Sequence, residues 1–271
     1  MQDIFDEIID CIRSEQDSYG TVYVGKSHLL EFVKDIPAAG QPQPASPAPA
    51  RSIPAAPAPA HIETPPAEIR KDPVFAPAPN VSAMGWTELK QAVASCHACR
   101  LCQQRRHTVF SDGNEHAELM FIGEGPGADE DAQGIPFVGR AGQLLTKMIT
   151  AMQFRREEVY IANIVKCRPP GNRNPEDDEA AVCLPYLQRQ IELVSPKVIV
   201  LLGNIALKGL LSRSGISKHR GQWTDYHGIM VMPTFHPSYL LRFEHEKGKA
   251  WSDLQQVMKV FGKVYKKQIG S

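Results

Sequence analysis

The segment from Leu119 to Gly127 constrains the fold of this chain more than any other. Leu119 to Ile122 is a short apolar run, as expected for a central strand of a parallel sheet. Glycines follow at positions 123, 125 and 127, and they permit backbone conformations that a side chain would forbid. The exposed N–H groups of such a turn can bind an anion or a carbonyl oxygen. Glu124 lies inside the turn and Glu130 follows it, so carboxylates stand beside this backbone cradle.

The spacing of these glycines excludes two common nucleotide-binding motifs. The dinucleotide fingerprint requires Gly-x-Gly-x-x-Gly, and a P-loop requires Gly-Lys followed by Ser or Thr. Neither pattern occurs at this turn. Because the turn alone also fits an ordinary strand-to-loop connection in an α/β protein, the segments around it must decide its function.

Strand-like and helix-like segments alternate after residue 84. Strands are predicted at 119–122, 159–165, 198–202 and 229–235. Helices are predicted at 87–94, 139–153, 176–193 and 250–265, with one more after Gly203-Asn204. This order predicts an α/β fold, a three-layer α/β/α sandwich around a central, mainly parallel four-stranded sheet. Ligands of such sheets bind at the carboxyl ends of the strands, where Glu124, Asn163 and His236 fall.

A segment rich in proline and alanine divides the chain. Residues 37–79 contain 13 prolines and 12 alanines, and because proline neither continues helices nor donates to sheets, we predict a disordered linker over 37–83. An amphipathic pattern in residues 1–36 predicts a small helical docking element. Residues 84–271 are predicted to form the main globular domain, and they carry 24 basic and 19 acidic residues. Such a mildly basic domain suits a polyanionic partner.

The sequence predicts a cytoplasmic protein without a membrane segment. No apolar run approaches the about 20 residues that a spanning helix needs, and the N-terminus lacks the pattern of a signal peptide. In the cytoplasm, cysteines are more often metal ligands than disulfide partners.

Four cysteines have a spacing typical of metal ligands. Cys96 and Cys99 form a C-x-x-C motif, and Cys167 and Cys183 lie far downstream. Four thiolates suit either zinc or a [4Fe–4S] cluster, and the spacing does not choose between them. Cys102 makes a second set with Cys96 and Cys99, and a group of reduced thiols without metal is the plain alternative. Arg105 and Arg106 are close enough in sequence to offset thiolate charge.

Five motifs occur in order between residues 96 and 242: C-H-A-C-R-L, G-E-G-P-G-A-D-E-D, G-I-P-F-V-G-R-A-G-Q-L-L, Y-I-A-N-I-V-K-C-R-P-P-G-N-R-N-P and F-H-P-S-Y-L-L-R. With them, the chain resembles the family 4 uracil-DNA glycosylases, which carry an iron–sulfur cluster. The resemblance implies a monofunctional hydrolase that removes uracil from single- or double-stranded DNA and initiates base-excision repair. It also implies a [4Fe–4S] cluster, in preference to zinc, on Cys96, Cys99, Cys167 and Cys183, with Cys102 outside the pattern. The loop after Cys167 lacks the Arg-Ile-His insertion of covalently trapping relatives, which favours turnover.

Uracil excision requires a site for a base that has left the helix stack. Phe137 is expected to stack on that base, and Asn163 to read its edge. His236 is placed to bind O2 as negative charge develops there. Glu124 and Glu130 are candidates for orienting the attacking water. Other glycosylases place Asp at the position of Gly125, so the partner of the water stays open, while the N–H groups around Gly125 could hold the uracil edge.

The segment after His236 is predicted to contact DNA. Leu240 and Leu241 would fill the gap left by the flipped base. Ser238 and Arg242, with Lys166 or Arg168, would bind phosphates. The alternative function is a catalytically degenerate module that binds DNA or a polymerase and retains the cluster. In either case residues 1–36 would recognise a protein partner, and the catalytic domain would be a monomer that associates with the nucleoid when it acts.

Overall fold

The computed structural model describes residues 80–265. The docking element predicted at 1–36, its protein partner and residues 37–79 of the predicted linker lie outside the described residues. Val81 falls within the predicted linker, yet its side chain is buried in the main core. The packed part of the chain therefore includes residues before position 84.

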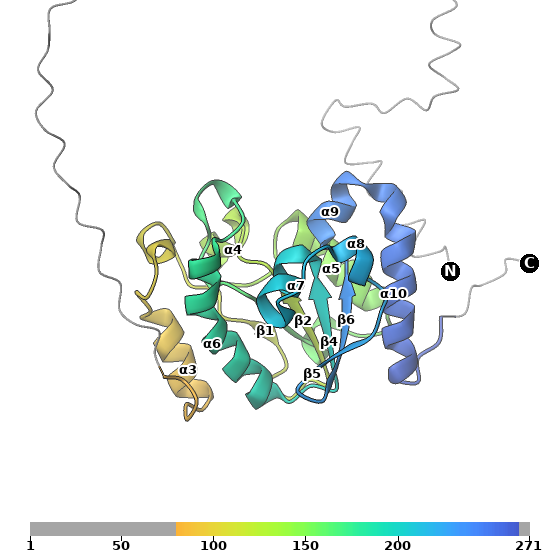
Figure 1. Ribbon diagram of the computed structural model, residues 1–271, viewed down its shortest axis with the longest axis horizontal. Helices are drawn as coiled ribbons and strands as arrows, with labels where there is room; N and C mark the ends of the chain where they lie inside the picture. Colours follow the sequence, from red (N-terminus) through yellow and green to blue (C-terminus); the bar gives the residue numbers. More distant parts are fainter. Residues whose placement is uncertain (1–79, 266–271) are drawn as a thin grey trace, which may run out of the picture. The chain divides into compact units, whose positions relative to one another are not determined.

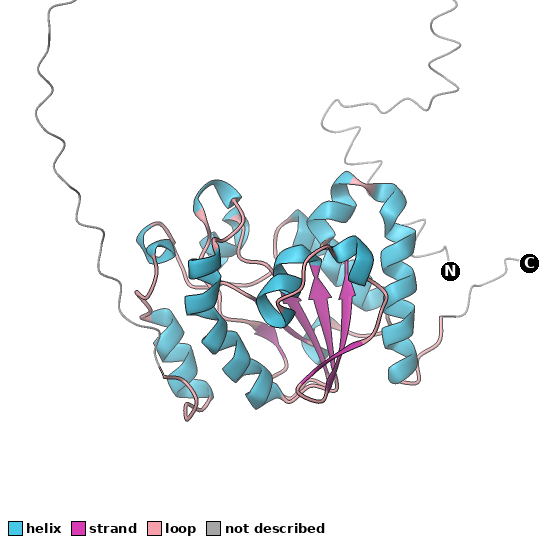
Figure 2. Ribbon diagram, viewed as in Figure 1, coloured by secondary structure: helices cyan, strands magenta, loops and turns pink. Residues whose placement is uncertain are grey.

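One sheet of six strands forms the centre, in the order β1-β3-β2-β4-β6-β5 (Figure 2). The four inner strands are parallel: β2 (Leu119–Gly123), β3 (Tyr160–Asn163), β4 (Val198–Leu202) and β6 (Ile229–Thr234). These confirm the four predicted strands. The predicted strand number is wrong, because β1 (Asp112–Gly113) and β5 (Thr224–Tyr226) add antiparallel edges. Both edge strands are too short and too polar to produce an apolar run.

Helices flank the sheet, as predicted (Figure 1). They are α3 (Trp86–Ala94), α4 (Ala128–Gln133), α5 (Arg140–Ala151), α6 (Asp177–Val194), α7 (Gly203–Leu211), α8 (Ile216–His219), α9 (Pro237–Arg242) and α10 (Lys247–Val260). Short 3-10 turns are η2 (Arg100–Gln103), η3 (Arg156–Glu158), η4 (Pro170–Asn172) and η5 (Glu244–Glu246). None of the helices between residues 80 and 265 has the length and apolar character to span a membrane.

Side-chain alternation along the strands distributes the core between two faces. Met120 and Ile122 of β2 belong to one buried cluster with apolar residues of α3, α6 and α7. Leu119 and Phe121 alternate with them and are equally buried, so they point to the opposite face. Helix α5 lies behind the strands in Figure 1, and α10 packs along β6. Both faces of the parallel strands are thus covered, which explains their continuous apolar sequences.

The strand order places a crevice above β2. The chain passes from β2 to β3 on one side and then returns to β4 on the other side of β2, which is the switch point where open α/β sheets bind ligands. The ladder continues beyond the strand ends, because Ile164 N–H donates to Gly123 O at 3.0 Å and Val165 N–H to Glu124 O at 3.1 Å. These bonds hold the glycine turn beside the segment that follows Asn163.

Candidate active site and cysteine cavity

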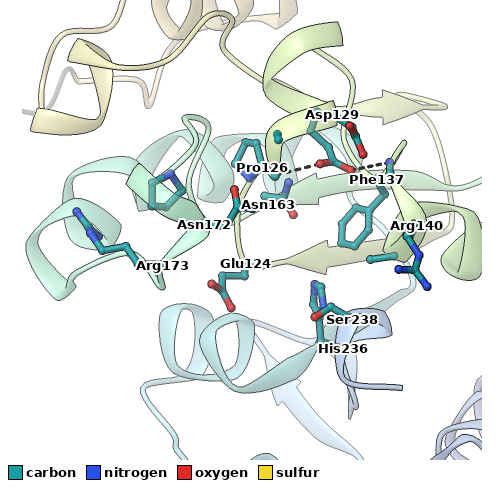
Figure 3. Close-up of a pocket in the computed structure, with 17 residues that line it drawn as sticks. Glu124, Pro126, Asp129, Phe137, Arg140, Asn163, Asn172, Arg173, His236 and Ser238 are labelled. Carbon is teal, nitrogen blue, oxygen red and sulfur yellow. Dashed lines mark hydrogen bonds between the residues drawn. The ribbon is translucent and has the colours of Figure 1, made fainter. Parts of the chain in front are cut away.

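A cavity of about 340 Å³ opens at the carboxyl ends of the parallel strands (Figure 3). The turn after β2, the loop before α5, the segment after β3 and the start of α9 surround it. It brings together seven of the predicted site residues: Glu124, Gly125, Glu130, Phe137, Asn163, His236 and Ser238. Residues as far apart in the sequence as Glu124 and Ser238 therefore line one pocket, at the place that the strand order predicts.

Asn163 reaches the pocket from the last position of β3. It is 1% exposed, and its Oδ1 is buried without a hydrogen-bond partner. Its backbone carbonyl accepts from Lys166 Nζ at 2.9 Å, which fixes the residue from behind. Burying an unsatisfied amide oxygen costs free energy of about 1–3 kcal/mol. Such a group in a pocket is suited to a ligand that supplies an N–H donor.

Phe137 forms an apolar wall of the same pocket. The residue adopts φ 53°, a left-handed conformation that an aromatic residue rarely takes and that is found at strained functional positions. Its ring packs against Gly123, where an added Cβ would collide with both the Phe137 ring and Asn163 Oδ1. The ring centroid lies 5.7 Å from that of His236, at an interplanar angle of 35°. Gly123 thus makes room for two of the predicted ligand-binding side chains.

His236 precedes α9 and caps it. Ser238 N–H donates to His236 Nδ1 at 3.1 Å, and the Ser238 hydroxyl lies 2.7 Å from the same nitrogen. Because Nδ1 accepts, the proton of the neutral imidazole belongs on Nε2. Burial and the nearby Arg242 charge lower the pKa of His236 to about 4. The ring is therefore a neutral donor at its pocket end.

The two candidate carboxylates have different surroundings. Glu130 accepts from the backbone N–H groups of Gly127, Val138 and Gly139 at 2.9–3.0 Å, so it joins the glycine turn to the loop that carries Phe137. Glu124 is half-buried at the pocket wall, and burial raises its pKa above the usual value. Of the two, Glu130 has the structural role and Glu124 faces the space that a substrate would fill.

The predicted DNA-contacting residues of α9 separate into buried and exposed groups. Leu240 is 2% exposed and packs in the interior, so in this conformation it is not presented to DNA as the predicted wedge. Leu241 is partly exposed and Arg242 is exposed. The sequence offers Lys166 or Arg168 as a phosphate ligand. Lys166 does not fit that role, because its ammonium group is buried and donates to Gln190 Oε1 at 2.6 Å. Arg168 is partly exposed and stays the predicted ligand of the two.

The pocket also contains residues that the sequence interpretation did not single out. Asp129, Arg140, Asn172 and Arg173 line it together with the predicted side chains (Figure 3). All four lie within the quoted motifs, between the glycine turn and the Arg-Asn-Pro that precedes α6. The motifs therefore mark the segments, but only the folded chain shows which of their residues line the cavity.

The cysteines predicted as ligands line a second, small cavity of about 20 Å³. Cys96, Cys99, Cys167 and Cys183 all face it, and so does Cys102. Within residues 80–265 no three ligand side chains converge closely enough to bind one metal ion. The five thiols thus surround a space, at the junction of α3, the segment after β3 and α6.

Two N–H groups donate hydrogen bonds to cysteine sulfurs at this cavity, and such bonds stabilise the thiolate form. Arg105 Nη1 donates to Cys167 Sγ at 3.1 Å, and the backbone N–H of Lys166 donates to Cys183 Sγ at 3.3 Å. Burial raises the pKa of Cys167 to about 11 and that of Cys183 to about 12. Such buried thiols ionise readily only when a metal centre accepts their charge. The donor set and its hydrogen bonds therefore fit an iron–sulfur cluster.

Comparisons with known proteins agree with this geometry. The family model described as "Uracil DNA glycosylase superfamily" matches residues 110–255, more than half of the chain. The type-4 uracil-DNA glycosylase of Thermotoga maritima is 48% identical over 157 residues, which cover 57% of this chain and 82% of that protein. The Sulfurisphaera tokodaii enzyme of the same name is 46% identical over 164 residues, which cover 57% of this chain and 74% of that protein.

A third type-4 uracil-DNA glycosylase, from Archaeoglobus fulgidus, is 38% identical over 185 residues, which cover 65% of this chain and 93% of that protein. The matched region contains the pocket and its four parallel strands. On these matches and on the motifs that build the pocket, the chain belongs to the uracil-DNA glycosylase superfamily and, within it, to the type-4 uracil-DNA glycosylases.

Proposed function

We propose that this protein is a monofunctional uracil-DNA glycosylase that hydrolyses the N-glycosidic bond of deoxyuridine in DNA and so initiates base-excision repair. The observation that carries the proposal is the unpartnered Oδ1 of Asn163, buried in a pocket beside an aromatic ring and a neutral histidine. Uracil supplies the N–H donor that this oxygen lacks. The related type-4 enzymes support the same activity.

Asn163 selects uracil over cytosine by the direction of its hydrogen bonds. Its Oδ1 accepts from uracil N3–H, and its amide donates to O4. Cytosine has no proton on N3 and carries an amino donor at position 4, so both bonds would be lost or reversed. Sites built on such polar pairs discriminate strongly, because a mismatched ligand leaves the buried groups unpaired.

The reaction begins with a base that has rotated out of the stack, since the C1′–N1 bond is otherwise hidden. Phe137 stacks on the base and holds its plane. As the bond to C1′ breaks, the electron pair moves to the base, and negative charge develops on O2. The Nε2–H of His236 donates to that oxygen, and a neutral donor suffices because the product leaves as an anion.

Water must reach C1′ as the sugar develops positive charge. Three carboxylates line the pocket, those of Glu124, Asp129 and Glu130, and Glu130 is engaged by three backbone N–H groups. Glu124 directly follows Gly123, which pairs with Asn163 in the sheet, so it stands beside the residue that reads the base. We therefore assign the orientation of the water to Glu124. Glu130 and the N–H groups near Gly125 hold the cradle, and Ser238, Leu241 and Arg242 contact the DNA strand.

A [4Fe–4S] cluster on Cys96, Cys99, Cys167 and Cys183 completes the proposal. When bound, it supplies a cross-link between segments that are far apart in the sequence. Arg105 offsets its charge through the bond to Cys167 Sγ. The residues in the active-site pocket perform the excision chemistry, so the cluster is assigned a structural role.

The direct test uses end-labelled DNA with one uracil, protein in excess, and matched strands that carry cytosine or thymine. We expect alkali-labile cleavage only at uracil, and a large loss of rate in Asn163→Asp. The exposed Asp177→Asn is the matched control and should behave as the wild type, since Asp177 lies on the surface and pairs with Lys208. Failure of protein with a full complement of iron to cleave would refute the glycosylase proposal in favour of the degenerate binding module.

A further inference from the structure

One buried carboxylate lies between the active-site pocket and the cysteine cavity. The side chain of Glu179, in the first turn of α6, is 0% exposed. It accepts two hydrogen bonds from the guanidinium of Arg173, at 2.8 and 2.7 Å. Arg100 Nε lies 3.1 Å from the same carboxylate, and Glu176 N–H donates to it at 2.8 Å. A single side chain thus binds two arginines from different segments.

These two arginines belong to the two sites. Arg173 is among the residues that line the active-site pocket, next to Asn172, and its guanidinium points away from Glu124 (Figure 3). Arg100 directly follows Cys99 and begins the turn that contains Cys102. Helix α6, which carries Glu179, also carries Cys183 one turn later. The Glu179 carboxylate therefore connects three parts of the chain: the segment after Cys99, helix α6 with Cys183, and the pocket wall at Arg173.

Glu176 also contacts both arginines, at 3.0 Å from Arg100 Nη2 and 3.6 Å from Arg173 Nη2, and Asp178 pairs with Arg100, but these contacts are made at the surface. Glu176, Asp177 and Asp178 have side chains that are 52%, 81% and 66% exposed, and exposed ion pairs contribute little. Glu179 is shielded from water and makes a bidentate pair with Arg173, the strong form of a carboxylate–guanidinium contact. Its hydrogen bonds with Arg173 hold the pKa of Glu179 below its usual value. It therefore remains a charged anchor at neutral pH.

We propose that Glu179 is a positioning residue that fixes the wall of the active-site pocket to the cysteine-bearing segment. This proposal rests on the proposed glycosylase function. Glu179 holds both terminal nitrogens of Arg173 and also contacts Arg100. The position of the 168–174 segment is therefore fixed by α6 and by the segment after Cys99. Displacing the cysteine segment moves Arg100, and through Glu179 it loosens Arg173 and Asn172 at the pocket.

Glu179→Gln tests the connection with little change in side-chain volume. The amide retains one acceptor but presents N–H groups to a guanidinium, so the bidentate pair is lost. We expect the single-turnover excision rate at saturating DNA to fall about 10-fold or more, with the half-saturating DNA concentration changed less than about 3-fold, since lost positioning affects the reacting complex. Visible absorption of the cluster and iron content should stay at wild-type values.

A second readout does not depend on activity. Trypsin cleaves after arginine, and we expect Glu179→Gln to be cut faster at Arg173-Asn174 and at Arg100-Leu101. Asp177→Asn, in the same first turn of α6 but exposed, is the matched control and should be cleaved at the wild-type rate. The double variant of Glu179→Gln with Arg173→Gln should lose no more rate than the worse single variant, because the two side chains act as one pair.

The outcomes separate this proposal from the proposed function. If the wild type excises uracil and Glu179→Gln matches Asp177→Asn in rate and in tryptic cleavage, Glu179 has no positioning role. Loss of iron from Glu179→Gln would assign it to cluster assembly and would also overturn the proposal. If Glu179→Gln does not fold, Arg173→Gln alone decides, because its normal rate would exclude the connection. Absence of excision by the wild type refutes the function, while the proteolysis still tests the contact.

Discussion

His236 illustrates how one backbone contact decides the chemistry of a side chain. His236 Nδ1 caps α9 by accepting from the Ser238 N–H, and this bond also places the imidazole proton on Nε2. The low pKa of about 4 keeps the ring neutral at physiological pH. A charged imidazolium would bind the leaving uracil anion more strongly, yet it would also have to be buried beside Arg242. The neutral ring avoids that cost and still donates one hydrogen bond.

His236→Asn separates these two roles, because asparagine is a good helix cap but does not reach as far into the pocket. We expect the variant to fold and to lose about 10²-fold in single-turnover rate, as when one oxyanion donor is removed. The rate is measured on uracil-containing DNA with excess protein. A variant with the wild-type rate would exclude His236 from stabilising the leaving base.

The same substitution has a consequence for stability at low pH. Between pH 6.5 and about 4 the unfolded chain binds a proton at His236 and the folded chain does not. The free energy of unfolding therefore falls as the pH is lowered through this window. His236→Asn should flatten that part of the curve, while the opposite contribution of Glu124, whose pKa is raised, is common to both proteins. Denaturant unfolding at pH 4.5 and pH 7 measures the difference.

At the scale of elements, the apolar runs located the parallel strands to within a few residues. The predicted strand at 198–202 matches β4, and the predicted closing helix at 250–265 is observed as α10, from Lys247 to Val260. These were predictable because burial on both faces leaves a continuous apolar signal. The closing helix ends earlier than predicted, where Gly262 adopts φ 67°. The short edge strands carried no such signal.

The sequence predicts a site residue best where its position depends on its own strand or turn, and poorly where its role depends on contacts with distant segments. Asn163 ends β3 and His236 follows β6, so their place at one edge of the sheet follows from the topology. Glu130 accepts from Gly127 in a local capping box, but its bonds from Val138 and Gly139 depend on the approach of the 134–139 loop, which no spacing in the sequence encodes. The burial of Lys166 likewise depends on Gln190 from a distant helix. Tertiary packing decided these roles.

Helix α9 provides a prediction of its own. Leu240→Ala should lower the free energy of unfolding by roughly 2–5 kcal/mol, as expected for a buried leucine. Leu241→Ala should cost less than about 1 kcal/mol, since its side chain is partly exposed, but it should weaken binding to uracil-containing DNA. Chemical denaturation and DNA titration measure the two effects. If Leu240→Ala stays fully stable and loses only DNA binding, then Leu240 leaves the core to act as the wedge.

At the scale of the molecule, the two cavities lie within one part of the chain. The pocket residues and all five cysteines that line a cavity fall between positions 96 and 238. Cys167 lies four residues after the end of β3. Cys183 lies on α6, the helix whose residue Glu179 contacts Arg173 at the pocket. We therefore propose that the catalytic domain begins near residue 80, ahead of the predicted start at 84, because Val81 packs in its core. The first 79 residues should then affect DNA binding through their charge alone.

Deletion of residues 1–79 tests this division. The deleted segment carries 6 basic and 11 acidic residues, and the remaining chain carries 24 and 19. The net charge thus rises from zero to +5, so the shortened protein should bind DNA more tightly at low salt and show a steeper salt dependence. The difference should shrink as the Debye length falls to about 3 Å near 1 M salt.

The maximal single-turnover rate of the shortened protein should equal that of the full chain, because every pocket residue remains. Excision is followed at saturating DNA over a series of salt concentrations, with iron content as the control for folding. A fall in the maximal rate at full iron content would place part of the catalytic machinery before residue 80. Equal DNA affinity at low salt would instead show that the acidic segment exerts no electrostatic effect on the DNA-binding face.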